Sequence, residues 1–276
     1  MYIGIDLGGT NIKAALVDKG HLVKKLSTAC PASESEVIVI ETLCGLITEL
    51  INKQVTGIGA GIPSVLDREK GIVYNAANIP SWQEVHLKEI LENRFQVKVM
   101  LNNDSNCFAL GVSTCGEGKA FADMVGITLG TGVGAGVIVN HKLYNGKNTG
   151  VGEIGSLPYL DSDYEHYCSS TFFPKFFGKS GKELSELAIE NNIMALQAWD
   201  EFGKHMGNLI KATMYCYDPE AIFLGGSIAK AFDYFKDSMW KCIQEFPYPA
   251  STAQLKVQPS TLEDAALLGA AMLCDE

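Results

Sequence analysis

The chain has 276 residues, of which 47% are hydrophobic and 20% are charged, so it is long enough for two domains with sizeable cores. Its formal net charge of −10, with no basic run, argues against non-specific binding to nucleic acid or to an anionic membrane. There is no segment typical of a signal peptide and no apolar run long enough to span a bilayer, so we expect a cytoplasmic location.

The first half of the chain predicts strands that precede helices. Residues 2–23 predict a β-meander, and apolar residues at helical spacing predict an amphipathic helix over 36–51. The other predicted elements of this half are a strand over 55–62, a helix over 87–95, a strand over 97–100 and a helix over 102–111.

The second half repeats this order of elements. Its predicted strands cover 124–128, 135–139, 221–224 and 255–258, and its predicted helices cover 182–191, 194–216, 231–243 and 265–273. Strands that precede helices in both halves predict an α/β fold.

Two glycine-rich turns stand inside similar β-rich runs. The first is Asp6-Leu7-Gly8-Gly9-Thr10 and the second is Leu129-Gly130-Thr131-Gly132-Val133-Gly134; the two runs are offset by 122 residues. Glycine and β-branched residues are common in strands, so the likeness could arise by chance. Because the order of the surrounding elements also repeats, we favour a duplication.

The turns have a composition suited to phosphate. Glycines such as Gly8 and Gly9 let backbone N–H groups approach phosphate oxygens, and Thr10 adds a hydroxyl donor. Asp6 could hold Mg²⁺ directly or through water, and Lys13 could neutralise phosphate charge. Taken alone, the first turn is equally consistent with a hairpin whose Asp bonds locally.

Two turns that face each other would grip a polyphosphate from both sides, the second through the backbone of Gly130, Thr131 and Gly132. Neither turn fits a Walker A loop, and a strand rather than a helix follows each one, so a P-loop NTPase and a dinucleotide enzyme are disfavoured.

The motifs together resemble the ROK family of sugar kinases within the actin-like ATPase fold. The resemblance covers nearly the whole chain, and it rests on the two glycine turns, Asn102-Asn103-Asp104, Asn78-Ile79-Pro80-Ser81-Trp82, Gly152-Glu153-Ile154-Gly155 and Phe223-Leu224-Gly225-Gly226. It implies two similar actin-like (ribonuclease H-like) domains with a cleft between them. We expect a smaller domain over 1–104 plus 263–276 and a larger one over 105–262.

Asp104 is the predicted general base. Phosphoryl transfer to an alcohol needs a base within reach of the hydroxyl, and the resemblance gives Asp104 that role. The alternative is a helix N-cap, which Asn102, Asn103 or Asp104 could each supply. The resemblance also implies that Asn103 and Asn78 bind the sugar.

Two carboxylates are the remaining predicted sugar ligands. A carboxylate can accept two sugar hydroxyls at once, and apolar neighbours predict that Glu153 is partly buried rather than a solvated loop acid. Where related proteins carry His after the Glu-x-Gly motif, this chain has Ser156, and the Cys-rich zinc loop of the family is missing. Alignment on 164–170 then makes Glu165 the second carboxylate.

The same comparison with the family predicts no structural zinc. The eight cysteines are scattered without a Cys-x-x-Cys pair, which predicts buried or partly buried free thiols. The nearest candidate ligands, His166 and Cys168, are too few for zinc. We interpret His166 as an exposed or packed residue in the first turn of a helix.

Other aromatic residues have a structural interpretation. Trp82 could stack on a sugar face, but packing is favoured. A stripe at helical spacing is typical of core or subunit interface; it comprises Met194, Leu196, Trp199, Phe202 and Met206.

The resemblance implies an ATP- and Mg²⁺-dependent kinase that phosphorylates a hexose hydroxyl, most simply the 6-position of glucose. Gly225 and Gly226 would lie near the nucleoside, and relatives suggest a homodimer. Fructose, mannose, allose, an N-acetylhexosamine or a glucoside remain alternative acceptors. Two other classes stay open: a sugar-responsive repressor, disfavoured because the first strand of the kinase core begins at the first residues, and a sugar sensor without catalysis.

Overall fold

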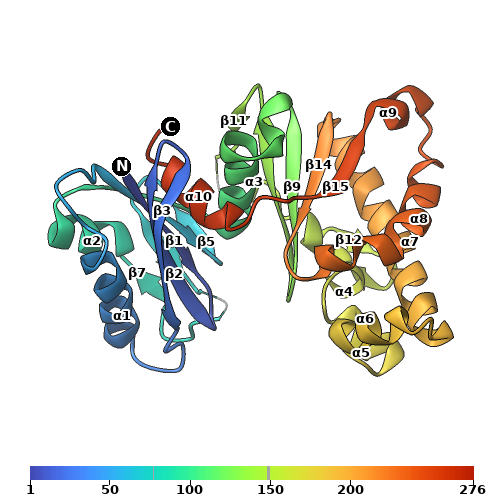
Figure 1. Cartoon of the computed structure of the whole chain (residues 1–276), viewed down its shortest axis with the longest axis horizontal. Helices are drawn as coiled ribbons and strands as arrows, with labels where there is room; N and C mark the ends of the chain where they lie inside the picture. Colours follow the sequence, from blue (N-terminus) through green and yellow to red (C-terminus); the bar gives the residue numbers. More distant parts are fainter. Residues whose placement is uncertain (77, 148–149) are drawn as a thin grey trace. The chain divides into compact units, whose positions relative to one another are not determined.

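A computed structural model describes residues 1–76, 78–147 and 150–276, and it forms two compact units (Figure 1). The first unit comprises Met1–Ala122, Gly136–Val151 and Thr261–Glu276, and the second comprises Asp123–Ala135 and Gly152–Ser260. Helices cover sheets in each unit, so the predicted α/β class is confirmed. The expected domains, 1–104 plus 263–276 and 105–262, remain a prediction; in the structure residues 105–122 lie in the first compact unit.

The first unit is built on a five-stranded sheet of order β3-β2-β1-β4-β8. Its strands are β1 (Tyr2–Leu7), β2 (Asn11–Asp18), β3 (His21–Ala29), β4 (Gly57–Ile62) and β8 (Lys98–Asn103). The first three are antiparallel, which confirms the β-meander, and β4 pairs parallel with both β1 and β8. The carboxyl ends of β1, β4 and β8 therefore meet at one edge of the sheet.

Helices cover both faces of this sheet (Figure 1). Helices α1 (Glu36–Thr48) and α2 (Leu87–Phe95) share a buried cluster with Ala14 and Leu16 of β2. Helix α10 (Ala265–Met272) packs with Ala15 and Val17, which alternate with them and face the other way. Helix α3 (Asp104–Cys115) packs closely on α10 because Gly111 and Gly269 have no side chains at the contact.

A small sheet of this unit was not predicted. It has the order β5-β6-β7, with β5 (Val65–Asp67), β6 (Ile72–Tyr74) and β7 (Glu84–Val85). Strands of two or three residues are too short to give a periodic pattern. The segment between β6 and β7 places Trp82 in the core, fully buried, which confirms its packing role.

The second five-stranded sheet has the order β11-β10-β9-β14-β15, which is the order of the first sheet with each strand replaced by its counterpart. Its strands are β9 (Met124–Leu129), β10 (Val133–Val139), β11 (Lys142–Leu143), β14 (Ala221–Gly225) and β15 (Lys256–Pro259). As with β4, strand β14 pairs parallel with both of its neighbours. The shared order supports the duplication inferred from the two turns.

Besides its strands of this sheet, the second unit contains six α-helices and a hairpin within the described residues. They are α4 (Tyr164–Cys168), α5 (Phe172–Phe177), α6 (Gly181–Ile189), α7 (Ile193–Tyr217), α8 (Phe232–Ile243) and α9 (Pro249–Gln254), with the hairpin β12 (Pro158–Tyr159) and β13 (Ser162–Asp163). Helices α7 and α8 pack on each other through aromatic residues. Trp199, Phe202 and Met206 are in that core, but Met194 and Leu196 are exposed, so the predicted stripe is only partly core.

Among the described residues, no helix is both long and apolar enough to cross a membrane. All eight cysteines are described and all are free thiols, as predicted. Cys216 is exposed, contrary to the expectation that the thiols are at least partly buried, because it lies on the outer face of α7.

Candidate functional site

The first glycine turn connects β1 to β2 and is held by its own backbone. The N–H of Gly8 donates to the carbonyl of Asn11 at 2.9 Å. A Cβ on Gly9 would lie 2.4 Å from Cβ of Asn78, so glycine is required for the turn to approach that residue. The structure thus places Asn78 directly against the turn in which Gly8, Gly9 and Thr10 were predicted to hold phosphate.

Asp6 and Lys13 form an ion pair beside this turn. They are direct partners in the β1–β2 register, and Nζ of Lys13 lies 3.1 Å from Oδ2 of Asp6. Both side chains keep access to solvent, with 24% of Asp6 and 41% of Lys13 exposed. The pair leaves a carboxylate and an ammonium available to a charged ligand.

Asp104 lies at the same sheet edge as Asp6. Asp6 pairs with Gly61 of β4, and Gly61 pairs with Asn102 of β8, so the three residues form one row across parallel strands. Neighbouring strands are about 4.8 Å apart, which puts Asp6 and Asn102 roughly 10 Å apart. Gly61 brings no side chain between them, and Asp104 follows two residues after Asn102 as the first residue of α3.

The N-cap of α3 is Asn103. Its Oδ1 accepts the N–H of Ser105 at 2.9 Å, and Oδ1 of Asp104 accepts the same N–H at 2.8 Å. Asn102 is buried and bonds Asn145 and Asn106 through its side chain. The alternative of a helix N-cap is therefore correct for Asn103, while the carboxylate of Asp104 stays partly accessible at the start of the helix.

A buried thiol lies beneath this carboxylate. Cys107, one helical turn after Asp104, is fully buried, and its Sγ would lie 3.2 Å from a Cβ on Gly61. Burial raises the pKa of Cys107 well above its usual value, and the charges of Asp104 and Asp6 raise it further. Cys107 is therefore a neutral packing residue that fixes α3 against β4.

The second glycine turn, between β9 and β10, is held from both ends by the segment around α4. The N–H of Gly130 donates to the carbonyl of Gly132 at 3.1 Å, which closes the turn. The N–H of Ser170 donates to the carbonyl of Gly130 at 2.8 Å. At the other end, the N–H of Val133 donates to Oε2 of Glu165 at 3.0 Å.

Glu153 and Glu165 are near each other in the second unit. Desolvation raises the pKa of Glu153, and the charge of Glu165 raises it further. The prediction that Glu153 is partly buried holds only in part: the residue as a whole is exposed, because it precedes the short 3₁₀ turn Ile154–Ser156, while its carboxylate is desolvated enough to raise its pKa. Ser156 is exposed on the same turn.

Gly225 and Gly226 end β14 next to the second turn. Gly226 has φ +87°, and a Cβ there would lie 2.1 Å from the carbonyl of Leu129, so only glycine fits. The residues that follow, Ser227 and Ile228, line a cavity of about 830 Å³. Ser170 lines the same cavity, so this space borders the turn at Gly130.

The cavity walls are largely apolar with a few polar groups. Trp199, Tyr234 and Phe173 contribute rings, and Lys182 and Lys230 contribute ammonium groups. Within the described part of the chain, the indole N–H of buried Trp199 has no hydrogen-bond partner. The cavity has the size and the mixed lining of a small-molecule site.

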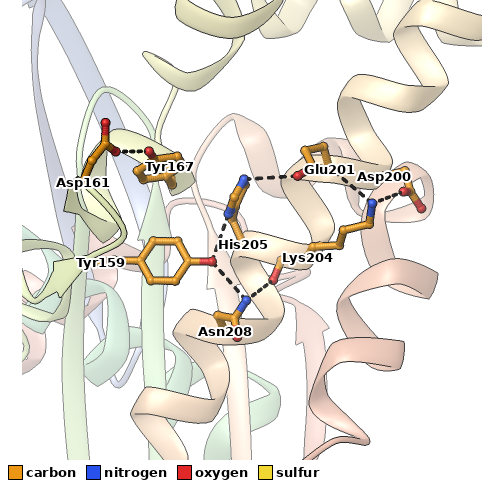
Figure 2. Close-up of polar contacts among 8 residues, drawn as sticks. All are labelled: Tyr159, Asp161, Tyr167, Asp200, Glu201, Lys204, His205 and Asn208. Carbon is orange, nitrogen blue, oxygen red and sulfur yellow. Dashed lines mark hydrogen bonds and ion pairs between the residues drawn. The ribbon is translucent and has the colours of Figure 1, made fainter.

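A cluster of tyrosine, histidine and asparagine side chains joins Tyr159 of the hairpin to α7 (Figure 2). The hydroxyl of Tyr159 lies 3.0 Å from Nδ1 of His205 and accepts Nδ2 of Asn208 at 3.0 Å, both on α7. Tyr159 stacks on Tyr164 of α4 with ring centroids 4.2 Å apart. Burial lowers the pKa of His205 and raises the pKa of Tyr159 to about 12, so both groups are neutral. These contacts join the hairpin β12–β13 and the helix α4 to α7.

His166 is an exposed residue in the first turn of α4, as predicted. Its Nδ1 lies 2.8 Å from Oδ1 of Asp163, the N-cap of that helix. Cys168 is fully buried. The described residues contain no group of three or more His, Cys, Asp or Glu side chains arranged to hold a metal, and the expected absence of zinc remains a prediction.

The described groups fit a Mg²⁺–nucleotide ligand in part. Hard cations prefer carboxylate oxygens, and Asp6 offers one that already faces a cation, the Nζ of Lys13. Asp6 is thus the residue that would hold Mg²⁺, directly or through water. The close-approach glycines Gly9 and Gly132 belong to the turns that would take the phosphates.

The structure brings the predicted residues together in two groups. The first unit holds Asp6, Gly8, Gly9, Thr10, Lys13, Asn78, Asn103 and Asp104, and the second holds Gly130, Thr131, Gly132, Glu153, Glu165, Gly225 and Gly226. Sequence reasoning missed Gly61, Ser170 and the cavity. Gly61 could have been suspected as a glycine at a strand end, but nothing local marks the wall of a cavity.

Comparison with known proteins gives a consistent set of relatives. A family model for the ROK family matches residues 2–276. The glucokinase of Thermotoga maritima is 29% identical to this chain in an alignment of 309 positions, which covers 99% of this chain and 97% of that protein. The xylose repressor of Bacillus spizizenii is 27% identical to this chain in an alignment of 290 positions, which covers 97% of this chain and 75% of the repressor.

A solved structure shares the fold over almost its whole length. It is a ROK family glucokinase from Streptomyces griseus in complex with glucose and AMPPNP. It is 25% identical to this chain, with a TM-score of 0.83, and the match covers 99% of this chain and 98% of that one.

Proposed function

The chain belongs to the ROK family and has its actin-like ATPase fold, and from that premise we propose that it is an ATP-dependent hexose kinase. The observation that carries the proposal is the position of Ser170. This residue lines the same cavity as Ser227 and Ile228, and its N–H donates to the carbonyl of Gly130 in the second glycine turn. In this proposal the cavity takes the nucleoside and the adjoining turn takes its phosphates, as a bound nucleotide would require.

The cavity is the proposed nucleoside site. Its rings, Trp199 and Tyr234, can pack against a base, and the indole N–H of Trp199 is a donor that the described residues leave without a partner. Gly225 and Gly226 let the end of β14 lie close to the end of β9 at Leu129, so the ribose of a nucleotide bound in the cavity can extend to the second glycine turn. Backbone groups at Gly130, Thr131 and Gly132 then face the phosphates.

The first turn and Asp6 supply the second set of phosphate and metal contacts in this proposal. Gly8, Gly9 and Thr10 offer backbone and hydroxyl donors, and Lys13 offers a positive charge. Mg²⁺, when bound near Asp6, would neutralise charge on the transferring phosphoryl group.

On the acceptor side, the carboxylate of Asp104 removes the proton from a sugar hydroxyl. The hydroxyl oxygen attacks the γ-phosphorus in line, the bond from phosphorus to the β-phosphate oxygen breaks, and ADP leaves. Asn103 and Asn78 bind sugar hydroxyls as hydrogen-bond donors or acceptors, and the carboxylates of Glu153 and Glu165 accept hydrogen bonds from sugar hydroxyls. Exclusion of water from the acceptor position would protect ATP from hydrolysis.

The 6-hydroxyl of glucose is the simplest acceptor, since the relatives include glucokinases. Ser156 supplies only a hydroxyl at the position after Gly155, so another hexose is the first alternative. A sugar-responsive regulator is the second candidate, favoured by the likeness to a xylose repressor. We also propose a homodimer, as expected from the family.

A coupled assay of ADP release over a panel of hexoses tests the proposal. A kinase releases ADP in the presence of ATP, Mg²⁺ and one or a few sugars, with little release without sugar. A regulator binds a sugar, as measured by calorimetry, and releases no ADP with any of them. The second result would overturn the kinase assignment.

A further inference from the structure

A carboxylate occupies one of the backbone donors of the second glycine turn. Oε2 of Glu165 accepts the N–H of Val133 at 3.0 Å. The same oxygen would lie 2.6 Å from a Cβ on Gly132, so it occupies the space that the absence of a side chain leaves beside Gly132. A negative charge therefore already sits where the turn would meet the negative charge of a phosphate.

The contact is built into the structure of this unit. The side chain of Asp163 caps α4 by accepting the N–H of His166 at 2.9 Å, and the N–H of Ser170 ties the other end of the segment to Gly130 at 2.8 Å. Tyr164, one residue before Glu165, is buried and stacked on Tyr159. The backbone of Glu165 is thus fixed beside the turn, while its exposed side chain can rotate.

We propose that Glu165 occupies the phosphate turn until a sugar draws its carboxylate away, so that the acceptor promotes binding of the nucleotide triphosphate. This inference rests on the proposed kinase function. A sugar offers hydroxyl donors to the carboxylate, and a phosphate offers oxygens to the N–H of Val133. When the hydrogen bond between Glu165 and Val133 breaks, the sugar binds the freed carboxylate and the phosphate binds the freed N–H. Each ligand therefore increases the affinity for the other.

The size of the effect follows from the charges. Two like charges close together repel each other more weakly where water surrounds them than in a protein interior. Glu165 is exposed, so a modest effect, a fivefold to tenfold change in affinity, is expected. The repulsion acts on the phosphates and not on the nucleoside.

Calorimetric titration with two probes separates these contributions. In the absence of sugar and with Mg²⁺ present, Glu165→Gln should bind AMPPNP roughly five to ten times more tightly than the wild type, and Glu165→Ala at least as tightly, since it also vacates the N–H of Val133. The affinity for adenosine, which carries no phosphate, should stay the same in all three proteins. Asp200→Asn removes an equivalent charge from α7, where Asp200 pairs with Lys204, and should change neither affinity.

Two outcomes would overturn the inference. Unchanged or weaker AMPPNP binding in both Glu165 variants would show that the carboxylate does not oppose phosphate. An equal change for adenosine and AMPPNP would show a general structural effect. If neither the wild type nor the variants bind AMPPNP or adenosine, the proposed kinase function fails as well. If the wild type binds AMPPNP and only the predicted changes in the Glu165 variants are absent, the inference fails and the proposed kinase function stands.

Discussion

Nζ of Lys13 lies 3.1 Å from Oδ2 of Asp6, directly across the β1–β2 ladder. The carboxylate proposed to hold Mg²⁺ and the ammonium proposed to contact phosphate therefore neutralise each other when no ligand is present. Both side chains are partly exposed, so the pair contributes little to stability, and its charges can be redirected to a ligand at small cost.

Lys13→Met should separate these two roles. Without the ammonium, Asp6 has a stronger field for cations, so the Kd for Mn²⁺ alone should fall roughly twofold to fivefold. The KM for ATP should rise about tenfold because a phosphate contact is lost. Mn²⁺ binding can be followed by electron paramagnetic resonance. Lys25→Met, which breaks the pair with Asp264, is the matched control and should change neither value. Weaker Mn²⁺ binding in Lys13→Met would contradict this account of the pair.

Alanine at the two glycines of the second turn should affect different substrates. A Cβ on Gly130 meets open space, whereas a Cβ on Gly132 meets Oε2 of Glu165 at 2.6 Å. Gly130→Ala should therefore raise the KM for ATP by placing a methyl group at the phosphate turn, without loss of stability. Gly132→Ala should displace Glu165 from the turn and free its carboxylate for the sugar, so the KM for the sugar should fall, while loss of the hydrogen bond to Val133 should lower the unfolding free energy by about 1 kcal/mol. Steady-state kinetics and urea unfolding measure both. A rise in the same KM for both variants would contradict the separate positions.

The fold was largely predictable because its elements are long and periodic. The helix at Leu87–Phe95 begins and ends where the pattern predicts, and the helix predicted over 194–216 is Ile193–Tyr217. The strands at β5 to β7 and the hairpin β12–β13 were missed because two or three residues carry no period. Their pairing depends on contacts with distant segments.

The candidate site was predictable only where motifs fall at strand ends. Asp6 and Asn102 meet in one row because both lie near the carboxyl ends of parallel strands. The contact of Glu165 with Val133 joins residues 32 positions apart, and the cavity joins α5, α6, α7 and the residues after Gly226. Such contacts come from tertiary packing, which local sequence does not encode.

Filling the cavity should block the nucleotide without unfolding the protein. Ser185 lines the cavity on α6 and is only half-buried. Ser185→Phe should raise the KM for ATP at least tenfold and change the unfolding free energy by no more than about 0.5 kcal/mol. Glu186→Phe, one residue further along the same helix and exposed, is the matched control and should leave the KM for ATP unchanged. Unaltered ATP kinetics in Ser185→Phe would exclude this cavity as the nucleoside site.

Acidification should destabilise the cluster around His205. Burial lowers the pKa of His205 in the folded protein, the charge of Lys204 lowers it further, and Glu201 raises it in part. The unfolded chain takes up a proton near pH 6.5, so this contribution to stability is complete above that pH and is lost as the pH falls through the lowered folded pKa. Urea unfolding at pH 7.5 and 5.5 measures the change.

His205→Gln removes the titrating group, so its unfolding free energy should depend less on pH than that of the wild type over this range. His166→Gln, at an exposed position, is the control and should keep the dependence of the wild type. The same slope in His205→Gln and in the wild type would rule out a contribution from His205.

Transfer of labelled phosphate from γ-labelled ATP to a panel of hexoses, in the wild type and in Asp104→Asn, tests the central claim most directly. We predict that the wild type labels at least one hexose, and that Asp104→Asn lowers kcat by at least about 100-fold. Calorimetry should show the same sugar affinity for both proteins. Near-normal transfer by Asp104→Asn, or no transfer by the wild type to any hexose, would contradict the account.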